Sequence, residues 1–407
     1  MHLIVGGGVV GLSVAWRLAR AGTRVTVIDP APARGASHAA AGMLAPVSEV
    51  SYTEESLLRL GLAALERWPA FAAELEADSG LRLDYRTQGT LDVAFDTDDL
   101  AALDELAVFM DKLGLPVRRL TGRECRRREP MLAPSVRGGV LAEGDAWVDP
   151  RRVTAALLAA LEKAGVALVR RRVAALVRDG SAVVGVRLEP PSAATGNVPA
   201  DATDGGRADS PNGRPIDASD GGRADASDAS DASGDVLTGE RVVLAAGAWS
   251  GGLTDLPVRP VKGQIMRLRS PSPLLGTCVR GVVHGSPVYL VPRGDGELVV
   301  GATQEELGFD TTVTAGGLYE LLRDARELVP GITELQVADV VAGLRPGTPD
   351  NLPLIGPYGP GLTVATGHHR GGVLLAPLTT AILHGEEGEL AALCAPQRFQ
   401  TAGQGSD

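Results

Sequence analysis

The residues Leu3-Ile4-Val5-Gly6-Gly7-Gly8-Val9-Val10-Gly11 decide the fold of this chain. The first three have the pattern of a short buried strand, and apolar residues then recur at helical spacing up to Gly22. Gly6, Gly8 and Gly11 therefore occupy a turn from strand to helix. Without a side chain, Gly6 allows a tight bend and Gly8 allows a pyrophosphate to approach the backbone. Gly11 allows the helix to pack closely on the strand. The pattern predicts a dinucleotide site at the helix N-terminus.

Asp29 strengthens this interpretation. A strand predicted at residues 24–28 leads directly into it, and a carboxylate at this place can accept hydrogen bonds from ribose hydroxyls. The negative charge would repel a 2′-phosphate, which disfavours NADP. The motif alone leaves FAD and NAD open, and an ordinary βαβ unit with an incidental acidic residue is the alternative.

Composition sets broad limits. A chain of 407 residues can form one large or two modest domains. We expect no membrane span, because no run of about 18 apolar residues occurs. The chain enters its first strand without a visible signal peptide, which predicts a cytoplasmic location. Its three cysteines, Cys125, Cys278 and Cys394, are too far apart in sequence to indicate a disulfide framework or a metal site. A net charge of -11 argues against a nucleic-acid partner.

Residues 192–234 differ from the rest of the chain. They are mostly Ala, Ser, Asp, Gly and Pro, and the near repeats at 204–209 and 220–225 look like sequence expansion. Such a segment cannot bury enough apolar surface to fold, so we predict a disordered low-complexity insertion. Apolar runs at 183–188 and 241–245 predict strands on either side, which makes the insertion a lengthened surface connection. A functional tether is the alternative.

The remaining pattern alternates helices and strands before the insertion and is rich in strands after it. Apolar faces predict helices at 57–75 and 100–113, and Asp149-Pro150 is typical of a helix start, here of a helix that ends before Gly165. Further elements are expected as strands at 166–169, 173–177, 258–268, 281–292, 297–301, 337–341 and 362–367, and as helices at 315–328 and 373–384. The second half thus predicts an antiparallel sheet with a helix on it.

Eight segments of the chain together form a family signature. They are Gly6 to Asp29, His38 to Pro46, Gly144 to Pro150, Leu244 to Trp249, Val261 to Gln264, Tyr289 to Arg293, Ala342 to Thr348 and Gly367 to Gly372. In this order they resemble the D-amino-acid oxidase and glycine oxidase family of FAD-dependent oxidoreductases. The resemblance covers nearly the whole chain except the insertion and the last few residues.

The resemblance implies an α/β fold that is α+β overall. A Rossmann-like FAD-binding domain of the glutathione-reductase type would be discontinuous, comprising residues 1–44, 146–254 and 345–407. A substrate-binding domain with a mixed, largely antiparallel sheet would comprise residues 45–145 and 255–344.

The resemblance also implies a noncovalent FAD and assigns residues to it. Pyrophosphate and ribose would lie against Gly6, Gly8, Val9, Val10, Gly11 and Asp29, the flavin ring against Ala41, Gly42 and Met43, and the adenine against Val173. The pyrimidine end would be covered by His368, His369, Arg370, Gly371, Gly372, Val373 and Leu374, with Gly247 in the same site. Reduced flavin is negative near N1 and O2, so amides at a helix start near Gly371-Gly372 would stabilise it.

An arginine is the expected ligand for an amino-acid carboxylate, because its planar fork forms a bidentate, charge-assisted pair. The family pattern assigns this role to Arg345, places Arg370 in the wall of the active site, and gives Tyr289 a part in closing the pocket. A single arginine is otherwise most often a solvated surface side chain. Gln304 stands where relatives carry methionine, so the pocket should be more polar. We expect His368 and His369 to be loop residues and not general bases, and no metal to take part.

The activity implied is oxidation of glycine, and also of sarcosine or small D-amino acids, to an imine that hydrolyses to glyoxylate and ammonia while oxygen becomes hydrogen peroxide. The glycine imine would feed the thiazole of thiamine, with a thiazole synthase as a partner, and relatives form tetramers. Alternatives are a sarcosine oxidase, a D-amino-acid dehydrogenase that passes electrons to another acceptor, a noncatalytic flavin-binding module, and an NAD-dependent dehydrogenase.

Overall fold

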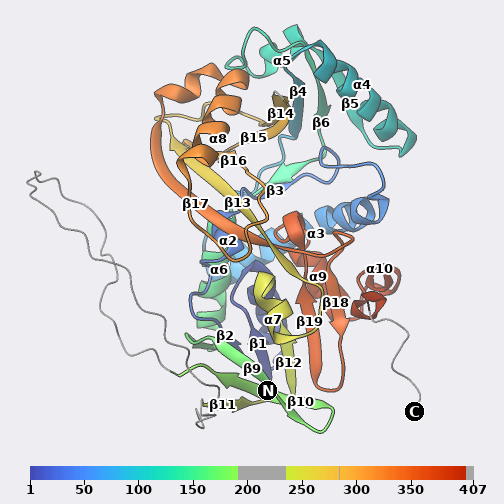
Figure 1. Cartoon of the computed structure of the whole chain (residues 1–407), viewed down its shortest axis with the longest axis vertical. Helices are drawn as coiled ribbons and strands as arrows, with labels where there is room; N and C mark the ends of the chain where they lie inside the picture. The colour runs from blue at the N-terminus through green and yellow to red at the C-terminus, as the bar shows by residue number, and fades with distance from the viewer. Residues whose placement is uncertain (191–234, 284, 400–407) are drawn as a thin grey trace, which may run out of the picture.

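The computed structural model of the protein describes residues 1–190, 235–283 and 285–399. Figure 1 shows two units along the long axis of the molecule, the lower one built on a six-stranded sheet and the upper one on an eight-stranded sheet. The insertion predicted at 192–234 lies outside the described residues, as does the end of the chain.

The six-stranded sheet carries the glycine turn. Its order is β18-β19-β12-β1-β2-β8, and all neighbours are parallel except β18 and β19. The strands are β1 (His2–Val5), β2 (Val25–Ile28), β8 (Ala167–Val169), β12 (Arg241–Leu244), β18 (Leu354–Pro357) and β19 (Leu362–Thr366). Alternate side chains point to opposite faces, so that Ile4 and Val243 enter one core cluster while Leu3 and Leu244 enter another.

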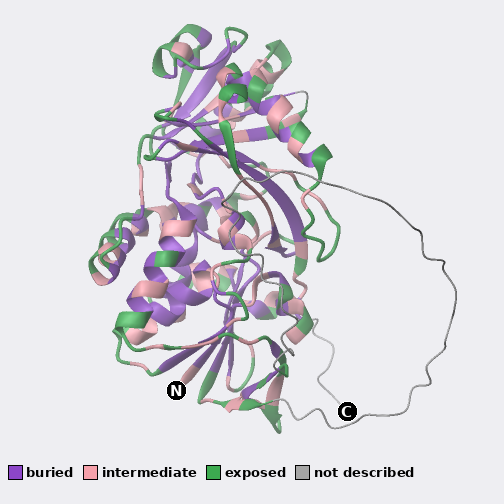
Figure 2. Cartoon of the chain, turned by 90° about the vertical axis from the view of Figure 1, so that its left-hand side faces the viewer, coloured by how far each residue is buried: buried purple, intermediate pink, exposed green. Residues whose placement is uncertain are grey.

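Each face of this sheet is covered by a different layer. The first face packs against helices, namely α1 (Val9–Arg20), α3 (Glu55–Ser79), α6 (Pro150–Lys163) and α9 (Ala376–Leu383). The second face packs against a three-stranded antiparallel sheet of β9 (Val173–Asp179), β10 (Ala182–Leu188) and β11 (Val236–Thr238). Figure 2 shows the strands of the central sheet buried between these layers.

The eight-stranded sheet has the order β17-β13-β16-β15-β14-β4-β6-β5 and is antiparallel except where β14 meets β4. Its strands are β4 (Thr90–Ala94), β5 (Val117–Thr121), β6 (Gly138–Ala142), β13 (Arg259–Arg269), β14 (Cys278–Val283), β15 (Ser286–Pro292), β16 (Glu297–Gly301) and β17 (Gln336–Gly347). Helix α8 (Ala315–Leu328) packs Leu321, Ala325 and Leu328 onto one face of it.

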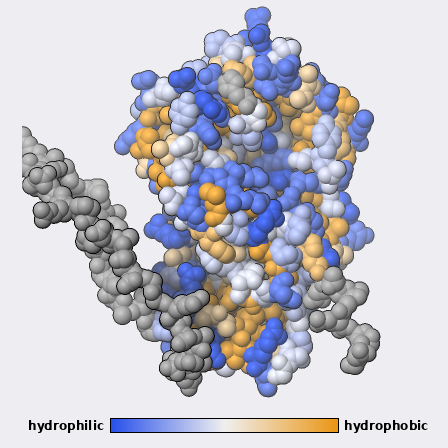
Figure 3. Space-filling model, viewed as in Figure 1, coloured by the Kyte–Doolittle hydropathy of each residue, from blue (hydrophilic) through white to orange (hydrophobic). Residues whose placement is uncertain are grey.

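Smaller elements complete the fold. A two-stranded ladder joins β3 (Met43–Leu44) to β7 (Ala146–Trp147), and the remaining helices are α2 (Ala36–Ala39), α4 (Thr97–Lys112), α5 (Gly122–Arg128), α7 (Ser250–Leu253) and α10 (Gly388–Leu393). The described part of the chain also contains 3-10 turns at η1 (Gly247–Trp249), η2 (Pro330–Glu334), η3 (His369–Gly371) and η4 (Pro396–Phe399). Among the described residues no helix is long and apolar enough to cross a membrane. Hydrophilic and hydrophobic residues are interspersed over the face seen in Figure 3.

Most of the elements expected from sequence are confirmed, including the α/β unit and the largely antiparallel second sheet. Asp149 caps α6 by accepting a hydrogen bond from the Arg151 amide, with Pro150 at the first position. The helix predicted from residue 373 begins instead at Ala376, because Gly371 closes a 3-10 turn by donating to the carbonyl of His368. Strands β4, β5, β6 and β18 had no counterpart in the sequence prediction.

The division into two domains, with its boundaries, remains a prediction. One helix packs in the other unit from the one in which that prediction places it. Helix α3 lies within the segment 45–145 that was expected in the substrate domain, yet its Leu60, Trp68 and Phe71 pack in the core of the lower unit against α1, α6 and α9.

The strands that flank the insertion allow a test of its role. Arg187 of β10 pairs with Val236 of β11, and the Leu188 amide donates to the carbonyl of Asp235, so the ends of the insertion are already joined as a hairpin. Replacing residues 192–234 by a short Gly-Ser turn should leave the fold intact and the unfolding temperature unchanged or higher, because a shorter loop costs less closure entropy. Far-UV circular dichroism and thermal unfolding measure this. A variant that is unfolded would contradict it.

Candidate functional site

The glycine turn between β1 and α1 has the geometry that the sequence pattern predicts. Gly6 has a φ of +113°, and a Cβ on it would overlap the carbonyl group of Ala245 at the end of β12. A Cβ on Gly11 would overlap the carbonyl oxygen of Gly6, so helix and strand touch at this point. A Cβ on Gly8 would meet only the Ser37 hydroxyl, at 3.4 Å. The first and third glycines therefore serve the fold, and the middle one leaves room for a ligand.

Two side chains fix this turn. Both carboxylate oxygens of Asp29 accept backbone hydrogen bonds at 2.7 Å, one from the amide of Gly7 and the other from that of Ala31. Ser37 accepts a hydrogen bond of 2.9 Å from the amide of Val9, the first residue of α1. Sequence reasoning found Asp29 and missed Ser37. A lone serine in an Ala-rich stretch offers no signal that it will face a helix start.

A single cavity of about 840 Å³ extends from the glycine turn to the eight-stranded sheet. Of the residues predicted for the site, it is lined by Gly6, Gly8, Val9, Val10, Asp29, Ala41, Gly42, Met43, Gly247, Tyr289, Arg345, His368, His369, Arg370, Gly372 and Val373. The structure thus brings together segments that are far apart in the sequence. The volume lies within the range of sites for organic ligands.

Four predicted residues do not line this cavity. Gly11 lies beneath the turn, as described above, and Gly371 and Leu374 line a smaller neighbouring cavity. Val173 is packed in the core between the six-stranded and three-stranded sheets. Its role at an adenine remains a prediction.

The loop that was expected beside the flavin ring is held from behind by backbone contacts. Gly42 has a φ of +81°, and a Cβ on it would overlap the carbonyl oxygen of Val148. The Val148 amide donates to the carbonyl of Gly42 at 2.9 Å, and Met43 pairs with Trp147 in the short ladder. Residues 40–43 therefore present their other side to the cavity in a fixed conformation.

Arg345 lies on β17 with its guanidinium over Gly263 of β13, where any side chain would overlap it. Its Nη1 donates to two carbonyl oxygens, that of Lys262 at 3.3 Å and that of Thr303 at 3.2 Å. Within residues 1–190, 235–283 and 285–399, no carboxylate lies within 4.0 Å of it. A fixed guanidinium without an anionic partner, facing a cavity, is suited to bind a carboxylate.

A buried polar cluster holds in place the backbone carbonyls that accept hydrogen bonds from Arg345. The sequence analysis did not predict this cluster. Lys262 is fully buried, and its Nζ lies 2.8 Å from Asp310 and 3.5 Å from Glu305. Gln264, likewise fully buried, donates to Glu305 at 2.8 Å and accepts from the Thr314 amide at 2.8 Å. These contacts join β13 to the connection between β16 and α8, which carries Thr303 and Gln304.

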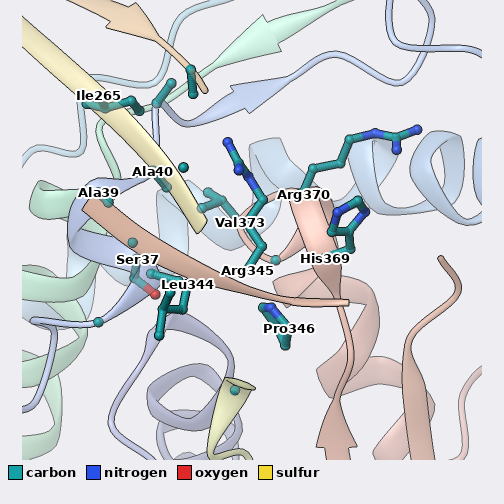
Figure 4. Close-up of a pocket in the computed structure, with 18 of the residues that line it drawn as sticks. Ser37, Ala39, Ala40, Ile265, Leu344, Arg345, Pro346, His369, Arg370 and Val373 are labelled. Carbon is teal, nitrogen blue, oxygen red and sulfur yellow. The ribbon is translucent and has the colours of Figure 1, made fainter. Parts of the chain in front are cut away.

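Arg370 behaves differently from Arg345. Its guanidinium forms an ion pair with Glu54, which also accepts a hydrogen bond of 2.8 Å from Asn351. Burial opposes ionisation of Glu54, but these two hydrogen bonds outweigh it and lower its pKa. Figure 4 shows the side chains of Arg345 and Arg370 diverging. Arg370 lines the cavity with its charge already paired with that of Glu54, and its place in an active-site wall remains a prediction.

The two histidines and the tyrosine that line the cavity are uncharged at neutral pH. Burial lowers the pKa of His368 to about 3, and burial together with Arg370 and Arg345 lowers that of His369 to about 4. His368 Nε2 lies 2.9 Å from the Thr379 hydroxyl. Burial raises the pKa of Tyr289, against the opposing charge of Arg345. With pKa values this low, both imidazoles are neutral at pH 7. That they are not general bases remains a prediction.

The structure separates the roles of two glycines, and we predict different defects for them. Gly11→Ala should destabilise the fold by roughly 3 kcal/mol, because its Cβ meets rigid backbone. Gly8→Ala should change the free energy of unfolding by less than about 1 kcal/mol but weaken binding of FAD, the ligand expected from sequence. Thermal unfolding of the apoprotein and titration with FAD measure both. Equal stability of the two apoproteins would be evidence against this division.

Comparison with known proteins agrees with this geometry. Residues 2–383 match the family described as DAO, FAD dependent oxidoreductase. A glycine oxidase of Geobacillus kaustophilus is 33% identical over 385 residues, which cover 92% of this chain and 89% of that protein. The crystal structure of glycine oxidase from the same organism superposes with a TM-score of 0.76 at 32% identity, covering 98% of this chain and 95% of that one.

A second kind of relative is longer. The bifunctional protein ThiO/ThiG of Trichormus variabilis is 32% identical over 382 residues, which cover 94% of this chain but 51% of that protein. The chain thus spans about half the length of this curated relative. By its family match and by its identity to relatives of its own length, the chain belongs to the DAO family of FAD-dependent oxidoreductases.

Proposed function

We propose that the protein oxidises glycine. Glycine and oxygen would give the imine and hydrogen peroxide, and water would convert the imine to glyoxylate and ammonium. The observation that carries this proposal is Arg345, a fixed guanidinium without a carboxylate partner among the described residues, at the far end of a cavity that begins at a dinucleotide turn. Several related proteins of similar length are named glycine oxidase, among them those of Geobacillus kaustophilus and Pseudomonas aeruginosa, which supports the same substrate.

The residues present fit the cofactor of the family. Room at Gly8 and the start of α1 suit a pyrophosphate, and the fixed loop at residues 40–43 lines the cavity where a ring would lie. FAD bound there would accept a hydride and pass the electrons to oxygen. Attachment is proposed to be noncovalent. The three cysteines are buried, and burial raises the pKa of Cys278, which lies in the same core cluster as Ala41, to about 12.

The side chains around Arg345 define the substrate. Its fork would hold the carboxylate and thereby aim the α-carbon hydrogen at the ring, so that geometry and not a base lowers the barrier. Tyr289 would close the site from β15, and Arg370, paired with Glu54, would form a wall without competing for the carboxylate. With both histidines neutral, the ammonium of the substrate would lose its proton to solvent before transfer.

We further propose that the product is passed on in thiamine synthesis to a thiazole synthase. The support is that related chains occur within longer proteins named bifunctional ThiO/ThiG, so that in those proteins a second part is joined to the matched half. A homo-oligomer and a cytoplasmic location are part of the same proposal. Three unpaired cysteines suit a reducing compartment.

One experiment tests the proposed reaction directly. The purified protein is made anaerobic, its flavin absorbance is recorded, and glycine, sarcosine or D-alanine is added before air is admitted. We expect glycine to bleach the yellow protein and air to restore the colour with release of peroxide. Bleaching by sarcosine or D-alanine but not by glycine would reassign the substrate. A yellow protein that no amine reduces would refute the enzymatic proposal.

Replacing Arg345 tests the carboxylate site. Arg345→Met should raise the KM for glycine roughly 100-fold or more, since hydrogen bonds to a charged group contribute about 1.5–3 kcal/mol each. Its flavin content should be unchanged. Arg119→Met is the matched control, because this arginine lies on the distant strand β5 and pairs with Asp111 at the surface. Equal KM values in the two variants would remove Arg345 from the site.

A further inference from the structure

Two buried arginines reach the back of the loop at residues 40–43 from the eight-stranded sheet. Arg267, on β13, is fully buried, and its Nη2 donates to the carbonyl oxygen of Ala40 at 3.3 Å. Arg293 directly follows β15 and is 2% exposed, and its Nη2 donates to the carbonyl oxygen of Ala41. Ala41 itself lines the cavity. One peptide unit therefore separates the Arg293 guanidinium from the ligand space.

The two arginines differ in how their charge is compensated. Arg267 forms an ion pair of 2.5 Å with Glu297 and is thus part of a neutral pair. Arg293 has no carboxylate within 4.0 Å in the described parts of the chain, and its Nε and Nη1 are buried there without a hydrogen-bond partner. Burial lowers its pKa to about 10, with Asp149, Glu297 and Asp84 opposing this from a greater distance. It is therefore a cation at pH 7.

An uncompensated buried charge is costly, and replacing such groups by apolar ones often stabilises a protein. No carboxylate of the described residues contacts Arg293, and its charge is opposed only by carboxylates at a greater distance. On the other side of the Ala41 peptide lies the cavity, where an anionic group could complete the compensation. A flavin is neutral when oxidised and acquires negative charge on reduction, so a nearby fixed cation favours the reduced form.

We propose that Arg293 raises the reduction potential of the bound flavin by its charge, acting through the peptide of Ala41. This inference rests on the placement of the flavin ring against residues 41–43. It does not depend on which amine is the substrate. Arg293 is a positioning and electrostatic residue, not a catalytic one, because a peptide unit lies between it and the ring.

The test separates the charge of Arg293 from its hydrogen bond. Arg293→Lys keeps the charge, whereas Arg293→Gln keeps a donor for the Ala41 carbonyl and loses the charge. The matched control is the double variant Arg267→Gln and Glu297→Gln, which removes a neutral pair from behind the same loop. FAD content and thermal unfolding of each holoprotein are recorded first, so that potentials are compared only among variants that bind flavin.

The readout is the midpoint potential of the holoprotein, measured against a reference dye without any amine. In Arg293→Gln the equilibrium constant for reduction should fall at least tenfold, which is about 30 mV for a two-electron couple. Affinity for sulfite, which adds to oxidised flavin to give an anion, should fall in parallel. Arg293→Lys and the control should keep both values within about twofold.

A potential in Arg293→Gln equal to that of the unmodified protein would overturn the proposal, as would an equal fall in Arg293→Lys, since that would assign the effect to hydrogen-bond geometry. Failure of glycine to reduce the protein leaves these measurements intact. The outcome for Arg293 is therefore distinguishable from the outcome for the proposed reaction.

Discussion

The ladder between β13 and β17 is the contact on which the site depends. It pairs the strands continuously from Arg259 with Gly347 to Arg269 with Gln336, with one bulge, at one edge of the eight-stranded sheet. Its register sets Val261 opposite Arg345, which places the guanidinium over Gly263. A shift by one residue would turn the arginine to the opposite face of the sheet and away from the cavity. Position along this ladder, more than the identity of any neighbour, makes Arg345 face the cavity.

Local sequence was sufficient to predict an element where a few adjacent residues determine where it begins or turns. The glycine turn, the Asp149-Pro150 helix start and the helix at 315–328 were all predicted with nearly their observed limits. Strands β4, β5 and β6 were not, because their pairing partners are distant in sequence and β4 joins the sheet through a parallel contact with β14. The short helix α5 had a readable signal, the capping box between Thr121 and Glu124, that was overlooked.

For the site, the sequence predicted most of the groups that line the cavity but not those that hold them in place. Arg345 and the cavity segments follow from motifs. The ion pair of Arg370 with Glu54 joins residues 316 positions apart, and no local sequence pattern predicts it. The buried cluster around Lys262 is equally hidden, since lysine is rarely buried without a partner and its partners lie on a loop of irregular sequence. The residues that hold the cavity-lining groups in place come together only in the folded structure, whereas several of the lining residues can be recognised from sequence motifs.

The hairpin of β10 and β11 has a consequence for how this protein can change. Its open end belongs to the outer three-stranded layer, at the opposite end of the molecule from α8 and the upper sheet in Figure 1. Nothing that lines the cavity comes from these strands. The hairpin therefore offers an attachment point remote from the cavity, at which a reporter or a second protein could be inserted into the middle of the chain.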